Sequence, residues 1–173
     1  KLDVQVKSAI GHDVTLSTIQ LDYQLPERFE LTYVDENGEK VRPVVIHRAI
    51  LGSLDRFIAF LLEETKGNLP LWLSPKQIIV LPVNNKYHQE YARKVLDDLR
   101  KEGFRVELDN RDEKLGYRIR EAQMRKIPYE LVLGNSERDE GTVTYRQYGQ
   151  QKQTTVSYDE FVSLIKDEIK HKS

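Results

Sequence analysis

The alternation of two hydrophobic patterns in the second half of the chain constrains the fold more than any other feature. Residues 77–83 form a nearly continuous apolar run, and Tyr87, Tyr91, Val95 and Leu99 then recur at every fourth position. A short unbroken apolar run is typical of a buried strand, whereas a four-residue repeat indicates a helix. This half is therefore predicted to begin with a strand followed by a helix.

The same alternation continues towards the end of the sequence. Further strands are predicted at 104–108 and 130–134, with a helix over Leu115 and Ala122 between them, and a hairpin about Gly149 and a closing helix follow. The order strand, helix, strand, helix, strand, hairpin, helix predicts an α/β domain. Its five-stranded mixed sheet should be largely parallel, with helices on its faces.

The first half has a different pattern. Strands are predicted at 2–6 and 14–21, and a hairpin at 31–34 and 41–47, because these runs alternate in polarity or are rich in β-branched residues. A single apolar stripe at helical spacing then predicts a helix over 54–62. This half is predicted to be α+β, a partial antiparallel sheet with one long helix.

Glycine and proline punctuate the stretch between the two patterns. Gly67 is a typical helix stop, and Pro70 and Pro75 follow it. We therefore predict one domain over residues 1–70 and a second over residues 71–173.

The composition of the chain excludes several classes of protein. Lys and Arg number 27 against 28 Asp and Glu, a net charge of −1, so any nucleic-acid site must be a local patch. Without cysteine, disulfides and thiolate metal sites cannot form within the chain. No apolar run reaches the roughly 20 residues of a membrane span, and the first residues read as an amphipathic strand instead of a secretory signal. We expect a cytoplasmic protein without membrane contact.

Three candidate sites lie in the first half. Arg56 falls in the first turn of the predicted helix, where free N–H groups attract anions, so it could meet a phosphate; from the residues alone, a solvated arginine is the commoner case. His47 ends an apolar strand and could bind zinc, but no second ligand lies at a metal-site spacing, so a hydrogen-bonded core histidine is the simpler interpretation. Polar residues along 15–20 could line a pocket or form the wet face of a half-buried strand. The other histidines fall in turn or surface contexts: His12, His88 and His171.

A basic stretch in the second half is a further candidate. Between Arg111 and Lys126 there are six cations and three acids, and Tyr117 and Tyr129 add aromatic surface for stacking on unpaired bases. Arg146, between two tyrosines of the predicted hairpin, is a weaker patch of the same kind. An ordinary solvated helix face is the competing interpretation.

Longer blocks resemble a known family. Residues 43–57, which read Pro-Val-Val-Ile-His-Arg-Ala-Ile-Leu-Gly-Ser-Leu-Asp-Arg-Phe, closely resemble the third signature motif of threonyl-tRNA synthetases, and residues 18–29 resemble the strand and loop before it. Residues 71–77 resemble the passage into the anticodon-binding domain of that family, and 112–120 and 127–129 resemble a helix and strand of that domain. The resemblance covers nearly the whole chain.

The resemblance implies a class II synthetase that activates threonine with ATP and Mg²⁺ and transfers it to tRNA(Thr). It places Lys1 beside the reacting phosphate and carboxylate, and Arg56 on the phosphates of ATP. It also implies positions that line the nucleotide and amino-acid pocket: Thr15, Thr18, Gln20 and Ser53. Thr15 stands where other members carry Gln, and its strand parity is opposite to that of Thr18 and Gln20.

The resemblance further implies that His47 is one of three ligands of a Zn²⁺ ion that reads the hydroxyl of threonine. A site that pairs with a hydroxyl rejects valine far better than an apolar pocket can. We therefore expect His47 and Arg56 to face one pocket. The other zinc ligands and the dimer-forming motif correspond to segments upstream of Lys1. The full-length protein is expected to be a homodimer, and the 173-residue chain alone is expected not to form threonyl-adenylate.

In the second domain the resemblance implies positions that face anticodon bases: Asp112, Lys126, Glu137 and Arg146. Asp112 and Lys126 differ in residue type from other members of the family. Two alternatives remain open: a stand-alone, non-catalytic RNA-binding module in which only residues 77–173 act, and a synthetase of the histidyl or prolyl type. Residues 43–57 argue against the second.

Overall fold

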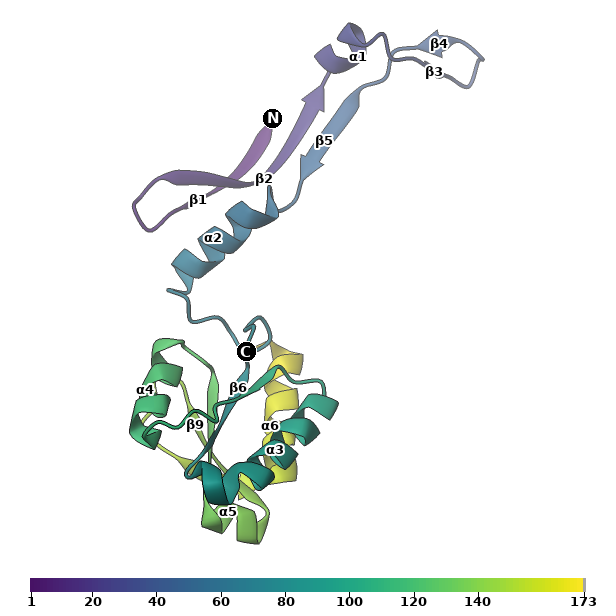
Figure 1. The fold of residues 1–173 in the computed structure, drawn as a ribbon. Coiled ribbons are helices and arrows are strands. Elements are labelled where there is room, and N and C mark those ends of the chain that lie inside the picture. The colour runs from purple at the N-terminus through teal and green to yellow at the C-terminus, as the bar shows by residue number, and fades with distance from the viewer. Residues whose placement is uncertain (173) are drawn as a thin grey trace. The chain divides into compact units, whose positions relative to one another are not determined.

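The computed structural model describes residues 1–172, and the chain divides into two units, Lys1–Gly67 and Asn68–Ser173 (Figure 1). The division lies three residues before the end predicted for the first domain. None of the helices in residues 1–172 combines the length and the apolar character that a membrane crossing needs.

The first unit is built on a three-stranded antiparallel sheet in the order β1-β2-β5, with a separate two-stranded hairpin and two helices. Its elements are β1 (Leu2–Lys7), β2 (Asp13–Asp22), α1 (Gln24–Arg28), β3 (Tyr33–Val34), β4 (Lys40–Val41), β5 (Val45–Ala49) and α2 (Leu54–Glu64). The predicted strand at 41–47 is wrong in one respect, because the structure divides it into β4 and β5. Pro43 lies at the break, and proline has no N–H to donate to a strand ladder.

The first unit buries almost nothing. Within residues 1–67, all of which the structure describes, Pro26 alone is buried. The apolar stripe of α2 lies open, with Leu54 67 %, Ile58 43 % and Leu62 44 % exposed. The amphipathic helix predicted from the sequence is thus formed, but much of its apolar stripe stays exposed within this unit.

The second unit is an α/β domain, as predicted, but its sheet is not largely parallel: two strand pairs are parallel and two are antiparallel. Its five-stranded mixed sheet has the order β10-β9-β8-β6-β7, in which β6 is parallel to β7 and β8, and the other pairs are antiparallel. Its elements are β6 (Ile78–Pro82), α3 (Asn85–Lys101), β7 (Val106–Leu108), α4 (Leu115–Met124), β8 (Tyr129–Leu133), α5 (Asn135–Glu140), β9 (Thr142–Gln147), β10 (Thr154–Ser157) and α6 (Tyr158–His171).

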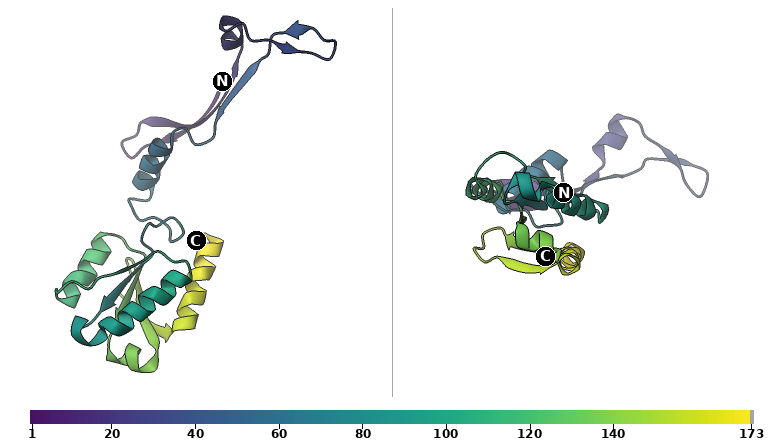
Figure 2. Two further views of the ribbon diagram at one scale, coloured as in Figure 1. Left: turned by 45° about the vertical axis from the view of Figure 1, so that its right-hand side comes forward. Right: turned by 60° about the horizontal axis from the view of Figure 1, so that its bottom comes forward.

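The sheet lies between α4 on one side and α3 with α6 on the other (Figures 1 and 2). The larger core lies on the α3 and α6 side, where Phe161 packs against the rings of Tyr129 and Tyr145. The smaller core joins Ile79 and Leu81 of β6 to α4. The strand alternation of β6 thus supplies apolar side chains to both layers.

The connections from β6 run in opposite directions from the carboxyl ends of the parallel strands. The chain leaves β6 through α3 to β7 on one side, and returns through α4 to β8 on the other. Loops at such a switch in strand order diverge and leave room for a ligand. Here they are the segments that follow Pro82, Leu108 and Leu133, and they include Asp112.

Candidate catalytic pocket and nucleic-acid interface

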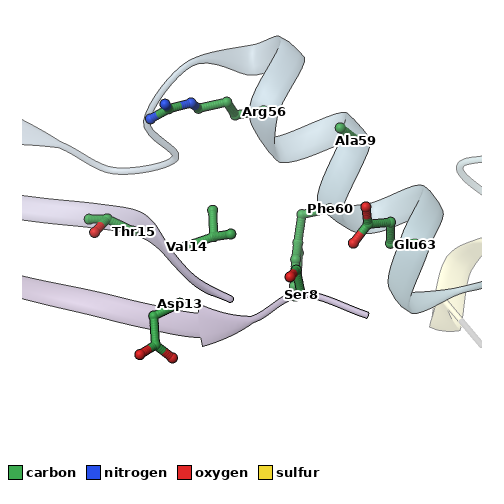
Figure 3. A pocket seen from close by; sticks show the side chains of 8 residues that line it. All are labelled: Ser8, Asp13, Val14, Thr15, Arg56, Ala59, Phe60 and Glu63. Atoms are coloured by element: carbon green, nitrogen blue, oxygen red, sulfur yellow. The ribbon is translucent and has the colours of Figure 1, made fainter. Parts of the chain in front are cut away.

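A cavity in the first unit lies between the start of β2 and α2 (Figure 3). Its volume is about 430 Å³, and it contains two of the predicted substrate residues, Thr15 and Arg56. Arg56 extends from the first turn of α2 towards the Thr15 side of the cavity. The remaining lining residues are Ser8, Asp13, Val14, Ala59, Phe60 and Glu63.

The turn before α2 explains why Arg56 reaches this place. The backbone of Gly52 has φ 61°, and a Cβ there would lie 3.4 Å from the carbonyl oxygen of Leu16. This close approach seats the helix start beside β2. Ser53 then caps the helix, because its hydroxyl accepts the N–H of Arg56 at 3.4 Å.

The position of Thr15 follows from an irregularity in the sheet. Val4 pairs with Ser17, but Gln5 pairs with Thr15, so Leu16 is an extra residue on β2. A bulge of this kind interrupts the regular alternation of side chains. From strand alternation alone, the sequence analysis placed Thr15 on the opposite face from Thr18 and Gln20. The bulge at Leu16 invalidates that argument. Thr15 lines the same cavity as Arg56.

A row of polar residues follows one face of the three-stranded sheet. The Lys1 ammonium contacts the Asp3 carboxylate at 3.1 Å, Asp3 lies opposite Thr18, and Gln20 donates to the Thr18 hydroxyl at 3.2 Å. His47 lies directly opposite Gln20. The hydrogen bond from Thr18, aided by Lys1, lowers the pKa of Asp3 below its ordinary value. Residues opposite each other in a sheet share a face, so all five belong together.

This polar row and the cavity are separate. Arg56 lines the cavity, whereas His47 does not, so the expected pocket shared by these two residues is not formed by this cavity. The reason is their place in the sheet, since His47 pairs near the end of β2 and Arg56 lies near its beginning. Thr18, Gln20 and Ser53 are likewise absent from the lining.

The described residues do not fit a complete zinc site. The His47 side chain is exposed, and its cross-strand neighbour is Gln20. Across residues 1–172, no three side chains of the His, Cys, Asp or Glu type gather closely enough to hold a metal ion. His47 could therefore supply one ligand, and further ligands would have to come from elsewhere.

In the second unit, Glu137 is engaged within the protein. One carboxylate oxygen accepts the N–H of Gly134 at 2.8 Å, and the other accepts the Thr144 hydroxyl at 2.6 Å. Burial opposes the charge, but these hydrogen bonds prevail and hold the pKa of Glu137 below its ordinary value. The carboxylate thus joins the start of α5 to β9.

Arg146 is also held internally. It lies opposite Glu130 in the pairing of β8 with β9, and its guanidinium contacts the Glu130 carboxylate at 3.0 Å. Glu130 is 0 % exposed, and the Arg146 side chain is 17 % exposed. Burial raises the pKa of Glu130 above its ordinary value, against the effect of Gln123 and Arg146.

The remaining two predicted residues lie at the two ends of α4. Asp112 is exposed in the loop that precedes the helix. Lys126 follows the helix in a left-handed conformation, φ 54°, and its N–H donates to the carbonyl of Gln123 at 3.0 Å. The four predicted residues therefore come from different parts of the second unit: the loop before α4, the residue after it, α5 and β9.

The basic stretch from Arg111 to Lys126 is less accessible to a ligand than the sequence suggests. Arg118 is 2 % exposed and Tyr129 1 % exposed, so neither can meet a ligand at the surface. Arg111 pairs with Asp109 and Glu121. The interpretation of this segment as an open basic patch is therefore wrong for its central residues, because the α4 face that carries Arg118 packs against the sheet.

Arg118 instead holds three backbone segments together. Its guanidinium donates to the carbonyl oxygens of Pro82 at 2.7 Å, Asp109 at 2.9 Å and Glu113 at 3.2 Å. These groups lie at the end of β6 and in the loop that carries Asp112. Sequence analysis missed this role, because a buried arginine within a run of charged residues has no local signal.

His88 and Glu130 also escaped the sequence analysis. His88, expected at the surface, is 4 % exposed. Its Nδ1 accepts the N–H of Asn84 at 3.0 Å, and its Nε2 lies 2.9 Å from the side-chain oxygen of Asn135. Glu130 did carry a signal, since it is a lone acid in an otherwise apolar strand.

Comparison with known proteins agrees with this architecture. Residues 77–168, more than half of the chain, match the family described as anticodon binding domain, and residues 1–65 match the tRNA synthetase class II core domain (G, H, P, S and T). The threonine–tRNA ligase of Bacillus velezensis is 59 % identical over 98 % of this chain, and that of Oceanobacillus iheyensis is 55 % identical over 99 %. The chain belongs to the threonyl-tRNA synthetase family. It spans about a quarter of the length of these relatives, 26 % and 27 %.

A solved structure of the threonyl-tRNA synthetase family supports the same assignment. The structure described as the RNA binding domain of threonyl-tRNA synthetase from Cryptosporidium parvum Iowa II superposes with a TM-score of 0.81. It is 39 % identical, and the match covers 96 % of this chain and 42 % of that one. The resemblance of the sequence to this family is confirmed.

Proposed function

We propose that this chain acts as part of a threonine–tRNA ligase, an enzyme that activates threonine with ATP and transfers it to tRNA(Thr). The observation that carries the proposal is the 55–59 % identity to threonine–tRNA ligases over nearly the whole chain. The class II core match is shared by five amino-acid types, so these relatives, more than the core match, favour threonine over histidine or proline.

In the first unit, Arg56 and Thr15 are proposed to contact ATP. Activation requires the threonine carboxylate to attack the α-phosphate while pyrophosphate leaves. A guanidinium at a helix N-terminus offsets the charge that develops on the phosphates, and catalysis of this kind is mainly positioning and charge stabilisation. The cavity that contains both residues supports this assignment. Mg²⁺ would accompany ATP as its counter-ion.

The polar row is proposed to serve the same reaction at a second surface. Lys1 would approach the reacting groups, and Thr18 and Gln20 would contact threonine, with Ser53 acting through the helix cap. Zn²⁺ remains a proposal that rests on the family resemblance, with His47 as one ligand completed by residues outside this chain. A homodimer and a cytoplasmic location are proposed for the full-length enzyme on the same basis.

The second unit is proposed to bind the anticodon arm of tRNA(Thr), with Asp112, Lys126, Glu137 and Arg146 near the bases. The match to an anticodon-binding family and the likeness to an RNA-binding domain support this role. The diverging loops at the carboxyl ends of β6, β7 and β8 offer a place for unpaired bases.

Binding of a fluorescent tRNA(Thr) anticodon stem-loop to the chain tests the proposal. We expect affinity to fall as salt rises, because phosphate contacts release counter-ions. A stem-loop of the same length with all three anticodon bases replaced should bind at least about tenfold more weakly, the effect of one or more lost base contacts. Equal affinity for the two RNAs would favour the alternative of a non-specific RNA-binding module.

A second experiment addresses catalysis in the full-length natural protein that contains this segment. We expect Arg56→Ala to reduce threonine-dependent exchange of pyrophosphate into ATP by about 10²–10³-fold, the scale of losing one charge-stabilising donor. Lys40→Ala, an exposed cation on the hairpin, is the matched control and should leave the rate unchanged. A normal rate for the Arg56 variant would remove this residue from the ATP site.

A further inference from the structure

The buried pair of Glu130 and Arg146 is an unusual feature of the sheet. Glu130 is the second residue of β8, flanked by Tyr129 and Leu131, which belong to the apolar core on the other face. Its carboxylate has no exposed surface. Taking two charges out of water costs more than a salt bridge usually returns, so apolar residues at both positions would serve stability at least as well. The pair therefore calls for a role beyond holding the sheet together.

The contact between the two side chains is incomplete. Gln123 of α4 donates to one carboxylate oxygen of Glu130, and Arg146 contacts the other. That second oxygen has no well-aligned hydrogen bond, and the Nε of Arg146 has no partner. A guanidinium has five N–H donors and commonly grips a carboxylate with two of them. Here a contact of 3.0 Å anchors one nitrogen of Arg146, while its Nε has no hydrogen-bond partner.

The surroundings place this anchored cation on a polar strip beside α4. On β9, Thr144 lies two positions before Arg146 and so shares its face, while Tyr145 between them points into the core. The Thr144 hydroxyl contacts Glu137 and Thr155. The strip therefore runs across β8, β9 and β10 and includes two of the residues proposed to face the anticodon.

We propose that Glu130 is a positioning residue for RNA recognition, which holds the guanidinium of Arg146 against the sheet so that its remaining donors meet acceptor atoms of an unpaired base. This inference rests on the proposed function of the second unit. A side chain that is already ordered does not have to be immobilised on binding. Loss of the anchor should therefore weaken RNA binding without removing the cation itself.

Two measurements on the full chain test the inference, each with Glu130→Gln, which keeps the shape and removes the charge. The first uses no RNA and follows the NMR order parameter of the Arg146 Nε–Hε group. We expect an ordered group in the unsubstituted chain and a mobile one in the variant, comparable to exposed Arg93. An order parameter that does not change overturns the positioning role.

The second measurement is the affinity for the anticodon stem-loop and for its base-replaced counterpart. We expect Glu130→Gln to weaken binding of the first about three- to tenfold, the cost of ordering one long side chain. In combination with Arg146→Ala it should add nothing to the loss from that change alone. Glu90→Gln, an exposed site on α3, removes the same charge and should have no effect. Additive losses from the two changes contradict the inference.

Stability is followed in parallel, because a buried substitution can unfold the domain. If Glu130→Gln lowers the melting temperature into the assay range, Arg146→Lys is the second variant, since lysine keeps the charge beside Glu130 but lacks the planar fork. It should lose the preference for the matched anticodon, and retention of that preference refutes the inference. If the unsubstituted chain fails to bind the stem-loop, the proposed function itself fails, and this inference with it.

Discussion

Replacement of Arg118 by alanine should be among the most destabilising single changes in the second unit. The side chain is 2 % exposed and donates to three backbone carbonyl groups, at the end of β6 and in the 109–113 segment. A buried acceptor that loses its partner costs about 1–3 kcal/mol. Allowing for water to reach the groups nearest the surface, the three together predict a loss of about 3–5 kcal/mol.

The assay is thermal and urea unfolding of the full chain, followed by circular dichroism. A loss of this size corresponds to a melting temperature lower by more than about 12 °C for a domain of this length. Arg120→Ala, an exposed position on the same helix, is the control and should change stability by no more than about 0.5 kcal/mol. If the Arg118 variant costs less than about 1 kcal/mol, the view that this guanidinium ties the strand ends together is wrong.

Three further predictions concern the same unit. Phe161→Ala removes a fully buried ring between two tyrosines and should cost about 3–5 kcal/mol in urea unfolding. Ser157→Ala removes the N-cap of α6, whose hydroxyl accepts an N–H of the first turn, and should cost about 1 kcal/mol, whereas Ser157→Asp should retain most of the stability. The lowered pKa of Glu137 means that its contribution is present above about pH 4.3, the ordinary value, and is lost as the pH falls through the lowered one. Glu137→Gln should therefore shrink the loss of stability between neutral and acid pH, and an unchanged acid limb of the stability curve would show that these hydrogen bonds do not act as described.

The strands and most helices of the second unit could be predicted from the sequence, because the spacing of apolar residues there matches which side chains the fold buries. Ile78–Pro82 is fully buried, so an unbroken apolar run was the correct signal for a central strand. The predicted closing helix is formed after Ser157, and the structure shows a reciprocal capping box between Ser157 and Glu160. Helix α5 was missed, because its six residues bury nothing and so leave no apolar periodicity to detect.

The sequence indicated which residues belong to the candidate site, but it did not indicate how they are arranged in space. Arg56 could be placed at a helix start from local pattern alone. Its neighbour Thr15 could not, because the bulge after Val4 changes which side chains share a face, and a bulge leaves no clear mark in the sequence. The burial of Arg118 and Glu130 depends on contacts between segments far apart in the chain, which no window of neighbouring residues contains.

The sparse burial within residues 1–67 has a consequence for how the chain responds to heat. Cooperative unfolding and its heat-capacity change both scale with the apolar area that folding removes from water. Calorimetry of the chain should therefore record essentially one endotherm, whose enthalpy matches about 100 residues and not 173. Amide hydrogens of α2 should exchange with solvent deuterium orders of magnitude faster than those of β6, since protection follows the free energy of local opening.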